Sequence, residues 1–165
     1  MRLRDTPTVE VSTRLGCSPE QAWALVTDIS LPTRAAGELQ RVEWLDGATG
    51  VAVGARFRGH NSNEAMGDWH TDSEIVEVED GRRWVWQVGE SDAPFAVWGF
   101  EVDPDGDGAT VRQWGKIGTG RSPLTAFVEQ HPEQEAAIVA HRMSVWRQGM
   151  TANLAMLTQL VDSRV

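Results

Sequence analysis

Several residue types are scarce or missing from this chain of 165 residues, which holds one cysteine and no tyrosine. The single cysteine, Cys17, excludes an internal disulfide bond and any zinc site made of several cysteines. No run approaches the roughly 18 consecutive apolar residues of a membrane-spanning helix. The first five residues also lack the apolar core of a signal peptide. We therefore expect a cytoplasmic protein that does not insert into membranes.

Positive charge is scarce as well, since 15 Lys and Arg residues stand against 24 Asp and Glu residues, a formal net charge of −9. Binding to nucleic acid depends chiefly on basic side chains that neutralise phosphates, so nucleic acid and anionic membranes are unfavourable partners. Hydrophobic residues at 41% and charged residues at 24% are typical of a soluble globular domain. The length suits a single domain, which we place at residues 8–165 after a flexible tail at residues 1–7.

Tryptophan is abundant by contrast, with eight Trp and four Phe residues in the chain. Tryptophan offers a large apolar face and one N–H donor. Such a concentration in a small domain indicates either a bulky core or a cavity lined with aromatic rings. The composition alone leaves both interpretations open.

The first part of the chain predicts one strand and two short helices. Apolar and polar residues alternate over residues 8–14, which is typical of a strand with one buried face. Ser18 then starts a helix as its N-cap, with Pro19 at the first helical position and Gln21 completing a capping box. Pro32 ends this helix, and residues 33–37 form a second short helix or turn.

Six strands are predicted next, at residues 39–45, 55–62, 69–79, 82–88, 95–102 and 110–118. Asp46-Gly47, Asp80-Gly81 and the run at residues 105–108 are hairpin signals. Such short connections join only antiparallel neighbours. The pattern therefore predicts an antiparallel meander with no repeats and no linker.

The last thirty or so residues, from about His131, predict one long helix. Apolar side chains recur there at steps of three or four, at Ala136, Val139, Ala140, Met143, Trp146, Met150, Leu154, Leu157 and Val161. At about 1.5 Å per residue the helix is roughly 45 Å long, so it must lie across another element. A curved sheet that bends around the apolar stripe of the helix is the expected partner.

This order of elements resembles the helix-grip fold of the START-like (SRPBCC) superfamily, and most of all its bacterial polyketide cyclase/dehydrase-type branch. The resemblance covers residues 9–160 and is carried by the segments 11–13 with 18–23, 53–61, 69 with 73–82, and 98–103. It implies an α+β fold, in which a seven-stranded curved antiparallel sheet wraps around the long C-terminal helix. It also implies an elongated pocket between sheet and helix for lipids, polyketides, sterols or other bulky apolar molecules, without a metal or nucleotide cofactor.

Aromatic residues from four strands of the meander agree with such a pocket. Alternation places Trp84, Trp86 and Val88 on one strand face, and Trp98 with its i+2 neighbours on another, but it does not show which face is concave. Trp69, Trp86 and Trp98 are expected to point inward, whereas Trp114 is less clearly placed because Gln113 and Gly115 fall on the other face of its strand. The predicted ligand-binding residues are Phe57, His60, Asn61, Trp69, Trp86, Trp98, Trp114, Val139, Met143, Trp146 and Met150.

His60 is the candidate catalytic residue, because an imidazole can act as an acid or base near neutral pH. A strand histidine that only hydrogen-bonds to a neighbour is the commoner case, and alternation allows either His60 or Asn61 to face the pocket. Asp68, His70 and Asp72 could join His60 in a metal site, but the spacing matches no known zinc motif and an exposed strand edge is favoured. We therefore predict no metal.

Other candidate motifs favour structural roles. Residues 103–108 imitate the start of a calcium loop, but Trp114 stands where its bidentate Glu belongs, so a solvated hairpin turn is favoured. The glycines at 115, 118 and 120 precede no phosphate-binding G-K-[ST], which argues against nucleotide binding. Cys17 precedes a helix N-cap but has no assigned base partner, so an inert thiol is expected.

Three functions fit these observations. The first is binding of a bulky hydrophobic or aromatic small molecule, with polar groups such as His60, Asn61 or Gln113 setting its orientation. The second is a polyketide cyclase or dehydratase acting in the same cavity, which would fold the substrate chain and move protons. The third is an interaction domain, which would need an exposed apolar patch on the terminal helix.

Overall fold

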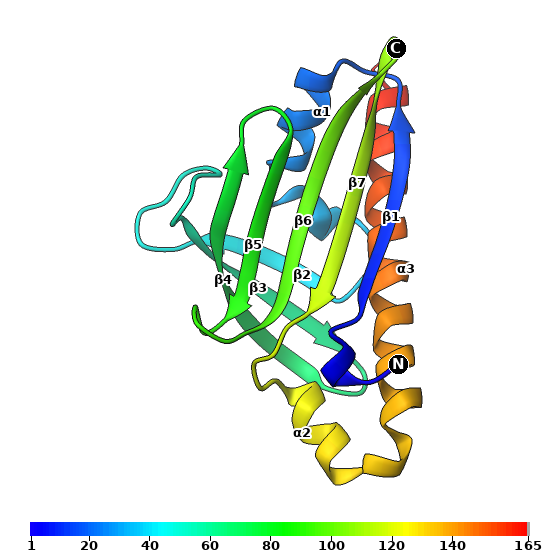
Figure 1. Ribbon diagram of the computed structural model, residues 1–165. Helices are drawn as coiled ribbons and strands as arrows, with labels where there is room; N and C mark the ends of the chain where they lie inside the picture. Colours follow the sequence, from blue (N-terminus) through cyan, green and yellow to red (C-terminus); the bar gives the residue numbers. More distant parts are fainter. Residues whose placement is uncertain (165) are drawn as a thin grey trace.

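The computed structural model describes residues 1–164 and shows one long helix lying against a strongly curved sheet (Figure 1). In chain order the elements are η1 (Leu3–Asp5), β1 (Thr8–Leu15), α1 (Pro19–Val26), η2 (Leu31–Arg34), β2 (Leu39–Trp44), β3 (Arg56–Asn63), β4 (Gly67–Glu79), β5 (Arg83–Gly89), β6 (Pro94–Asp105), β7 (Gly108–Ile117), α2 (Pro123–Gln130), η3 (Pro132–Gln134) and α3 (Glu135–Asp162). The predicted α+β helix-grip fold is confirmed, with seven antiparallel strands and a long C-terminal helix.

The sheet follows the order β1-β7-β6-β5-β4-β3-β2. Strands β2 to β7 form the expected meander, and β1 pairs antiparallel with β7 at the far edge of the sheet. Register shifts interrupt the ladders between Leu39 and Arg41, between Ile75 and Glu77, and between Val88 and Gly89. Such irregularities bend and twist strands, and β2 and β3 run across the molecule at a steep angle to β6 and β7 (Figure 1).

The start of α1 follows the predicted capping box. Ser18 accepts a hydrogen bond from the backbone N–H of Gln21, and the Gln21 side chain accepts one from the Ser18 N–H. The helix ends at Val26, before Pro32, and Pro32 lies instead within the 3-10 helix η2. The second short element therefore occupies Leu31–Arg34, slightly earlier than residues 33–37.

The C-terminal region holds one helix that the apolar pattern did not predict. Ser122 caps α2 through the backbone N–H of Thr125, with Pro123 at the first helical position. This is the same Ser-Pro signal that starts α1. The long helix α3 consequently begins at Glu135, after η3, and not at His131. Among the described residues, no helix is long and apolar enough to span a membrane.

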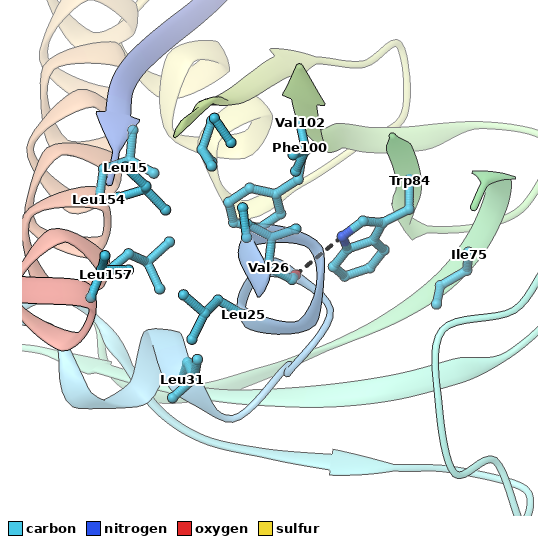
Figure 2. Packing of buried hydrophobic residues seen from close by; sticks show 14 of the residues in the cluster. Leu15, Leu25, Val26, Leu31, Ile75, Trp84, Phe100, Val102, Leu154 and Leu157 are labelled. Carbon is cyan, nitrogen blue, oxygen red and sulfur yellow. Dashed lines mark hydrogen bonds between the residues drawn. The ribbon is translucent and has the colours of Figure 1, made fainter. Parts of the chain in front are cut away.

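The larger hydrophobic core lies at the end of the molecule where α1 meets the C-terminal part of α3 (Figure 2). Leu154, Leu157 and Val161 of α3 pack there with Leu25 of α1 and Leu31 of η2. The indole of the buried Trp84 donates a hydrogen bond of 3.1 Å to the Val26 carbonyl, shown as a dashed line in Figure 2. This contact ties α1 to the sheet.

A smaller core lies at the other end of α3. Val139 and Met143 pack there with Val9 of β1, Ile117 of β7 and Val128 of α2. The N-terminal segment also joins this end, since Leu3 packs against the cluster and its N–H donates to the Glu135 carboxylate at 3.0 Å. Residues 3–5 of the expected tail thus form a 3-10 helix that contacts the start of α3.

Candidate functional site

Between the two cores the sheet and α3 enclose a cavity of about 660 Å³. Alternate residues of β3 to β7 supply its wall, and the middle of α3 supplies the opposite side. Residues 28–39, which include η2, close one flank. We call the sheet face that lines this cavity the inner face, and the opposite face the outer face.

Aromatic rings cover the inner face of β5 and β6. Trp84 stacks on Trp86 with ring centroids 4.4 Å apart. The Trp86 ring lies nearly parallel to Trp98 at 6.4 Å, and it stacks on Phe100 at 5.9 Å with a 30° tilt. Trp146 of α3 meets Trp98 at 4.3 Å. Offset stacking of this kind fixes the rings as a broad apolar surface.

Glycine at position 115 allows Trp98 and Trp146 to approach each other. Gly115 lies opposite Trp98 in the β6–β7 ladder. A Cβ atom there would stand 2.8 Å from the Trp98 ring and 3.2 Å from the Trp146 ring. Any larger residue would push the two indoles away from β7, so the bridge between sheet and helix depends on this glycine.

Two buried amides interrupt the apolar lining. Gln113 of β7 and Asn153 of α3 are 8% and 4% exposed, and both line the cavity. The Asn153 Nδ2 donates a hydrogen bond of 3.0 Å to Gln113 Oε1. Ser73 of β4, also 4% exposed, adds a hydroxyl to the same lining. The cavity is therefore mainly apolar with a few fixed polar groups, which is the usual composition of a small-molecule site.

An ion pair joins α3 to Glu38, the residue just before β2, at the edge of the cavity. Nη1 and Nη2 of Arg142 donate to the Glu38 carboxylate, at 2.8 and 3.0 Å, and Asn63 Nδ2 donates to the same carboxylate at 2.9 Å. Four residues line the cavity and are also exposed to solvent: Asp28, Ala36, Gly37 and Gln148. They mark where the cavity reaches the surface.

Five of the predicted ligand-binding residues line the cavity: Phe57, Trp86, Trp98, Trp146 and Met150. Asn61 and Trp69 face each other in the β3–β4 ladder. Asn61 lies on the same face of β3 as the lining residue Gly59, and Trp69 lies on the same face of β4 as the lining residue Thr71. Neither Asn61 nor Trp69 is itself part of the lining.

His60 lies on the outer face of β3, away from the lining residues. Its Nε2 is 2.9 Å from Arg41 Nη2 and 3.6 Å from the Glu43 carboxylate. The hydrogen bond from Arg41 holds the pKa of Glu43 below its ordinary value, with a smaller contribution from His60. Since Phe57 and Gly59 point inward, alternation turns His60 outward. The position predicted for a catalytic acid or base thus lies outside the cavity.

Trp114 also points away from the cavity. Strand alternation brings Gln113 and Gly115 to the inner face and leaves Trp114 on the outer one, where it covers Gly99. The Arg83 guanidinium stacks over its ring at 5.3 Å from the centroid. Trp114 is therefore part of the outer packing of the sheet and does not belong to the cavity lining.

Val139 and Met143 pack into the smaller core and not into the cavity. The reason is α2, which the sequence pattern did not reveal and whose Val128 covers this end of α3. The helix surface that lines the cavity begins at Arg142 and ends at Asn153.

The other candidate sites have structural partners. Arg58 binds Asp72 through two hydrogen bonds of 2.7 and 2.9 Å, and this contact lowers the pKa of that carboxyl. Within residues 1–164, no group of three or more His, Cys, Asp or Glu side chains could hold a metal ion. In the acidic turn Arg14 binds Asp107 at 2.5 Å. Burial raises the pKa of the Cys17 thiol.

Sequence reasoning missed Asn153, Arg142 and the flank at residues 28–39. Asn153 had a detectable signal, since it lies three residues after Met150 and four before Leu157, in the middle of an apolar stripe. A buried amide at such a position costs free energy unless it has a partner. The pairing of Arg142 with Glu38 joins residues 104 apart in the chain, so no local pattern reveals it.

Comparison with known proteins agrees with this architecture. No match was found among curated proteins. Among solved structures, a Polyketide_cyc-like protein of Corynebacterium glutamicum is 21% identical with a TM-score of 0.68, covering 99% of this chain and 94% of that one. The ginseng (Panax ginseng) major latex-like protein 151 is 13% identical with a TM-score of 0.63, covering 94% of this chain and 97% of that one.

A third similar structure is the di-domain ARO/CYC BexL from the BE-7585A biosynthetic pathway. It is 12% identical with a TM-score of 0.70, and the match covers 96% of this chain and 52% of that one. A family model described as "Polyketide cyclase / dehydrase and lipid transport" matches residues 6–161. With nearly the whole chain matched and the helix-grip fold in place, this protein belongs to the polyketide cyclase/dehydrase and lipid transport family, within the START-like (SRPBCC) superfamily.

Proposed function

We propose that this protein binds a bulky, flat hydrophobic or aromatic small molecule, of lipid- or polyketide-like size, in the cavity between the sheet and α3. The observation that carries the proposal is the cavity of about 660 Å³ between the aromatic wall and Trp146. Pockets for small molecules typically measure about 300–1,000 Å³. Family membership and the fold of the similar structures support the same class of ligand.

Apolar burial supplies the affinity in this proposal. At about 25 cal/mol per Å², a ligand that buries roughly 200 Å² of apolar surface gains about 5 kcal/mol before the costs of binding are subtracted. Stacking on Trp86 and Trp98 adds to this gain for a flat aromatic ligand.

Binding without catalysis is favoured by the ionisable groups at the cavity. Those among the lining residues are Asp28, Glu38 and Arg142, and the last two neutralise each other. None of the lining residues is a histidine. A carrier or binding protein needs no acid or base at the ligand, so this set of groups suits it.

The test combines two measurements on the recombinant protein. Mass spectrometry of the native protein identifies apolar molecules that co-purify with it, without assuming a ligand class. Titration with polycyclic aromatic probes then follows quenching of tryptophan fluorescence, which we expect because four indoles line the cavity. His60→Ala, on the outer face, serves as the matched control and should bind as the wild type does. If no molecule in a broad panel binds, the proposal is wrong.

A second candidate is a cyclase- or dehydratase-type activity in the same cavity, favoured by the likeness to the di-domain ARO/CYC BexL. In that case a cavity-filling change should abolish both binding and turnover of a poly-β-ketone substrate. Because His60 lies outside the cavity lining, we expect His60→Ala to retain turnover, and a loss of turnover with binding retained would instead favour catalysis by His60. Retained turnover would exclude His60 from the reaction. The cytoplasmic location expected from the sequence stays a prediction.

A further inference from the structure

The buried amide of Asn153 has one hydrogen-bonding atom without a partner. Its Nδ2 donates to Gln113, but its Oδ1 is buried and accepts no hydrogen bond within the described part of the chain. The residue is 4% exposed and lines the cavity. An unmet buried acceptor costs roughly 1–3 kcal/mol, so this atom needs a donor that the described part of the chain does not supply.

Gln113 has unused capacity at the same place. Its Oε1 accepts from Asn153, and within residues 1–164 its side chain makes no other hydrogen bond. The Gln113 Nε2 therefore remains available as a donor on the inner face of β7. Together the two amides offer one acceptor and one donor.

These amides stand beside the aromatic wall. Gln113 lies opposite Phe100 in the β6–β7 ladder, and Phe100 stacks with Trp86 at 5.9 Å. Asn153 follows Met150 by one helical turn on the cavity side of α3. A flat ligand lying on the indoles would thus bring its edge to the amide pair.

We infer that the Gln113–Asn153 pair recognises a hydroxyl group on the edge of a flat aromatic ligand, an inference that rests on the proposed binding function. A hydroxyl can donate to Asn153 Oδ1 and accept from Gln113 Nε2, whereas a carbonyl or ether oxygen can only accept. A water molecule can meet the same need in the unliganded protein, and the ligand hydroxyl then takes its place. The pair selects hydroxylated ligands over purely apolar ones of the same shape.

The test compares 1-hydroxypyrene with 1-methylpyrene by fluorescence titration at neutral pH. A methyl group and a hydroxyl are similar in size, but the methyl compound is more apolar and would bind more tightly in a cavity without polar groups. We expect the hydroxyl compound to bind the wild type several-fold more tightly, up to about tenfold, because a buried amide meets its hydrogen bond. Equal affinities, or a preference for the methyl compound, would overturn the inference.

Asn153→Leu removes the unmet acceptor at similar side-chain volume but frees Gln113 Oε1, so the hydroxyl preference should shrink. Thr158→Val is the matched control on the same helix, because within residues 1–164 the Thr158 hydroxyl bonds only to the Leu154 carbonyl, and Thr158 lies outside the cavity lining. It should keep the wild-type preference. Gln113→Met is a second variant in case Asn153→Leu folds poorly, and it should weaken the preference.

The outcomes separate this inference from the proposed function. Binding of both probes with no hydroxyl preference leaves the binding function standing and removes the role of the amide pair. Binding of neither probe contradicts the proposed function, and the inference falls with it. An unchanged hydroxyl preference in both Asn153→Leu and Gln113→Met would place the polar contact elsewhere.

Discussion

Two lengths of the same helix, α3, show opposite packing. From Leu154 to Val161 its apolar side chains are buried against α1, η2 and the sheet, with Leu157 only 1% exposed. From Arg142 to Asn153 the helix lines a cavity, and at Gly149 a Cβ would have no atom within 4 Å other than those of the adjacent residues and helix backbone.

The difference shows that one length of the helix serves the stability of the fold and another length lines the proposed binding site. At the C-terminal length of α3, Leu154 and Leu157 share a core with Leu25 and Val26 of α1 (Figure 2). Beside the middle of the helix, residues from the segment 28–39 line the cavity instead. We therefore expect changes at the packed end to lower the free energy of unfolding, and changes at the hollow part to alter ligand affinity.

Leu157→Ala tests the packed end and should have the largest effect. Removing a fully buried leucine loses apolar burial and leaves a void, which costs about 2–5 kcal/mol of unfolding free energy. Chemical denaturation measures this loss. A cost below about 1 kcal/mol would show that the C-terminal part of α3 is loosely packed, and the contrast between the two lengths would disappear.

Trp84→Phe tests the boundary between the two regions. Trp84 is 2% exposed, and its indole bonds to the Val26 carbonyl of α1. Phenylalanine leaves that buried carbonyl without its donor and opens a small void, so we expect a loss of about 2 kcal/mol. Thermal unfolding provides the measurement. If stability is unchanged, the bond does not hold α1 in place.

Glu101→Gln tests the outer face of the sheet, on the side away from the cavity and from α3. Glu101 is 16% exposed and binds Arg83 and Arg112. Burial alone would raise its pKa, but the hydrogen bonds from the two arginines outweigh this and lower it. The Glu101 carboxylate therefore stabilises the fold fully above its pKa in the unfolded chain, about 4.3. This stabilisation is lost as the pH falls through the lower pKa that Glu101 has in the folded protein.

At pH 7 we expect Glu101→Gln to cost about 1 kcal/mol, since surface ion pairs contribute little even in small networks. The difference from the wild type should shrink as the pH falls below about 4. Denaturation curves at a series of pH values follow it. A difference that stays constant down to low pH would mean that the charge of Glu101 does not stabilise the fold.

Gly149→Ala tests the hollow part and should have the smallest effect, with the opposite sign. Glycine in a helix interior is destabilising by about 1 kcal/mol relative to alanine, and a Cβ at this position meets no other atom. We expect the variant to be slightly more stable than the wild type. A loss of stability in thermal unfolding would show that the space beside Gly149 is already filled.

Much of the fold could be predicted because its signals are local. Alternation located the strands within a few residues, and the Ser18 capping box located the start of α1. The short element α2 escaped because it carries too few apolar residues to establish a period, although Ser122 and Pro123 mark its start as Ser18 and Pro19 mark that of α1.

The site was only partly predictable because its geometry depends on register and on contacts distant in sequence. Phe57, Trp86 and Trp98 follow from strand alternation. Neighbouring residues of a strand point to opposite faces, so Trp114 points outward because Gln113 beside it faces inward. The partner of Asn153 lies 40 residues away, and the partner of Arg142 lies 104 away, so neither could be read from a local pattern.

Of the residues that the structure describes, the large apolar side chains most exposed to solvent are Met1, Val53, Met66, Val76 and Phe127. None of them lies on α3. The interaction-domain hypothesis, which needs an apolar patch on that helix, finds no support in this arrangement.

The most direct test of the central claim fills the cavity from α3. Gly149→Leu places an apolar side chain in the open space, while Gly149→Ala controls for the loss of glycine. Titration of both variants and the wild type with 1-hydroxypyrene should show an affinity at least tenfold weaker for Gly149→Leu, with unfolding free energy retained. Equal affinity in all three proteins would mean that the ligand binds outside the cavity, and would contradict this account.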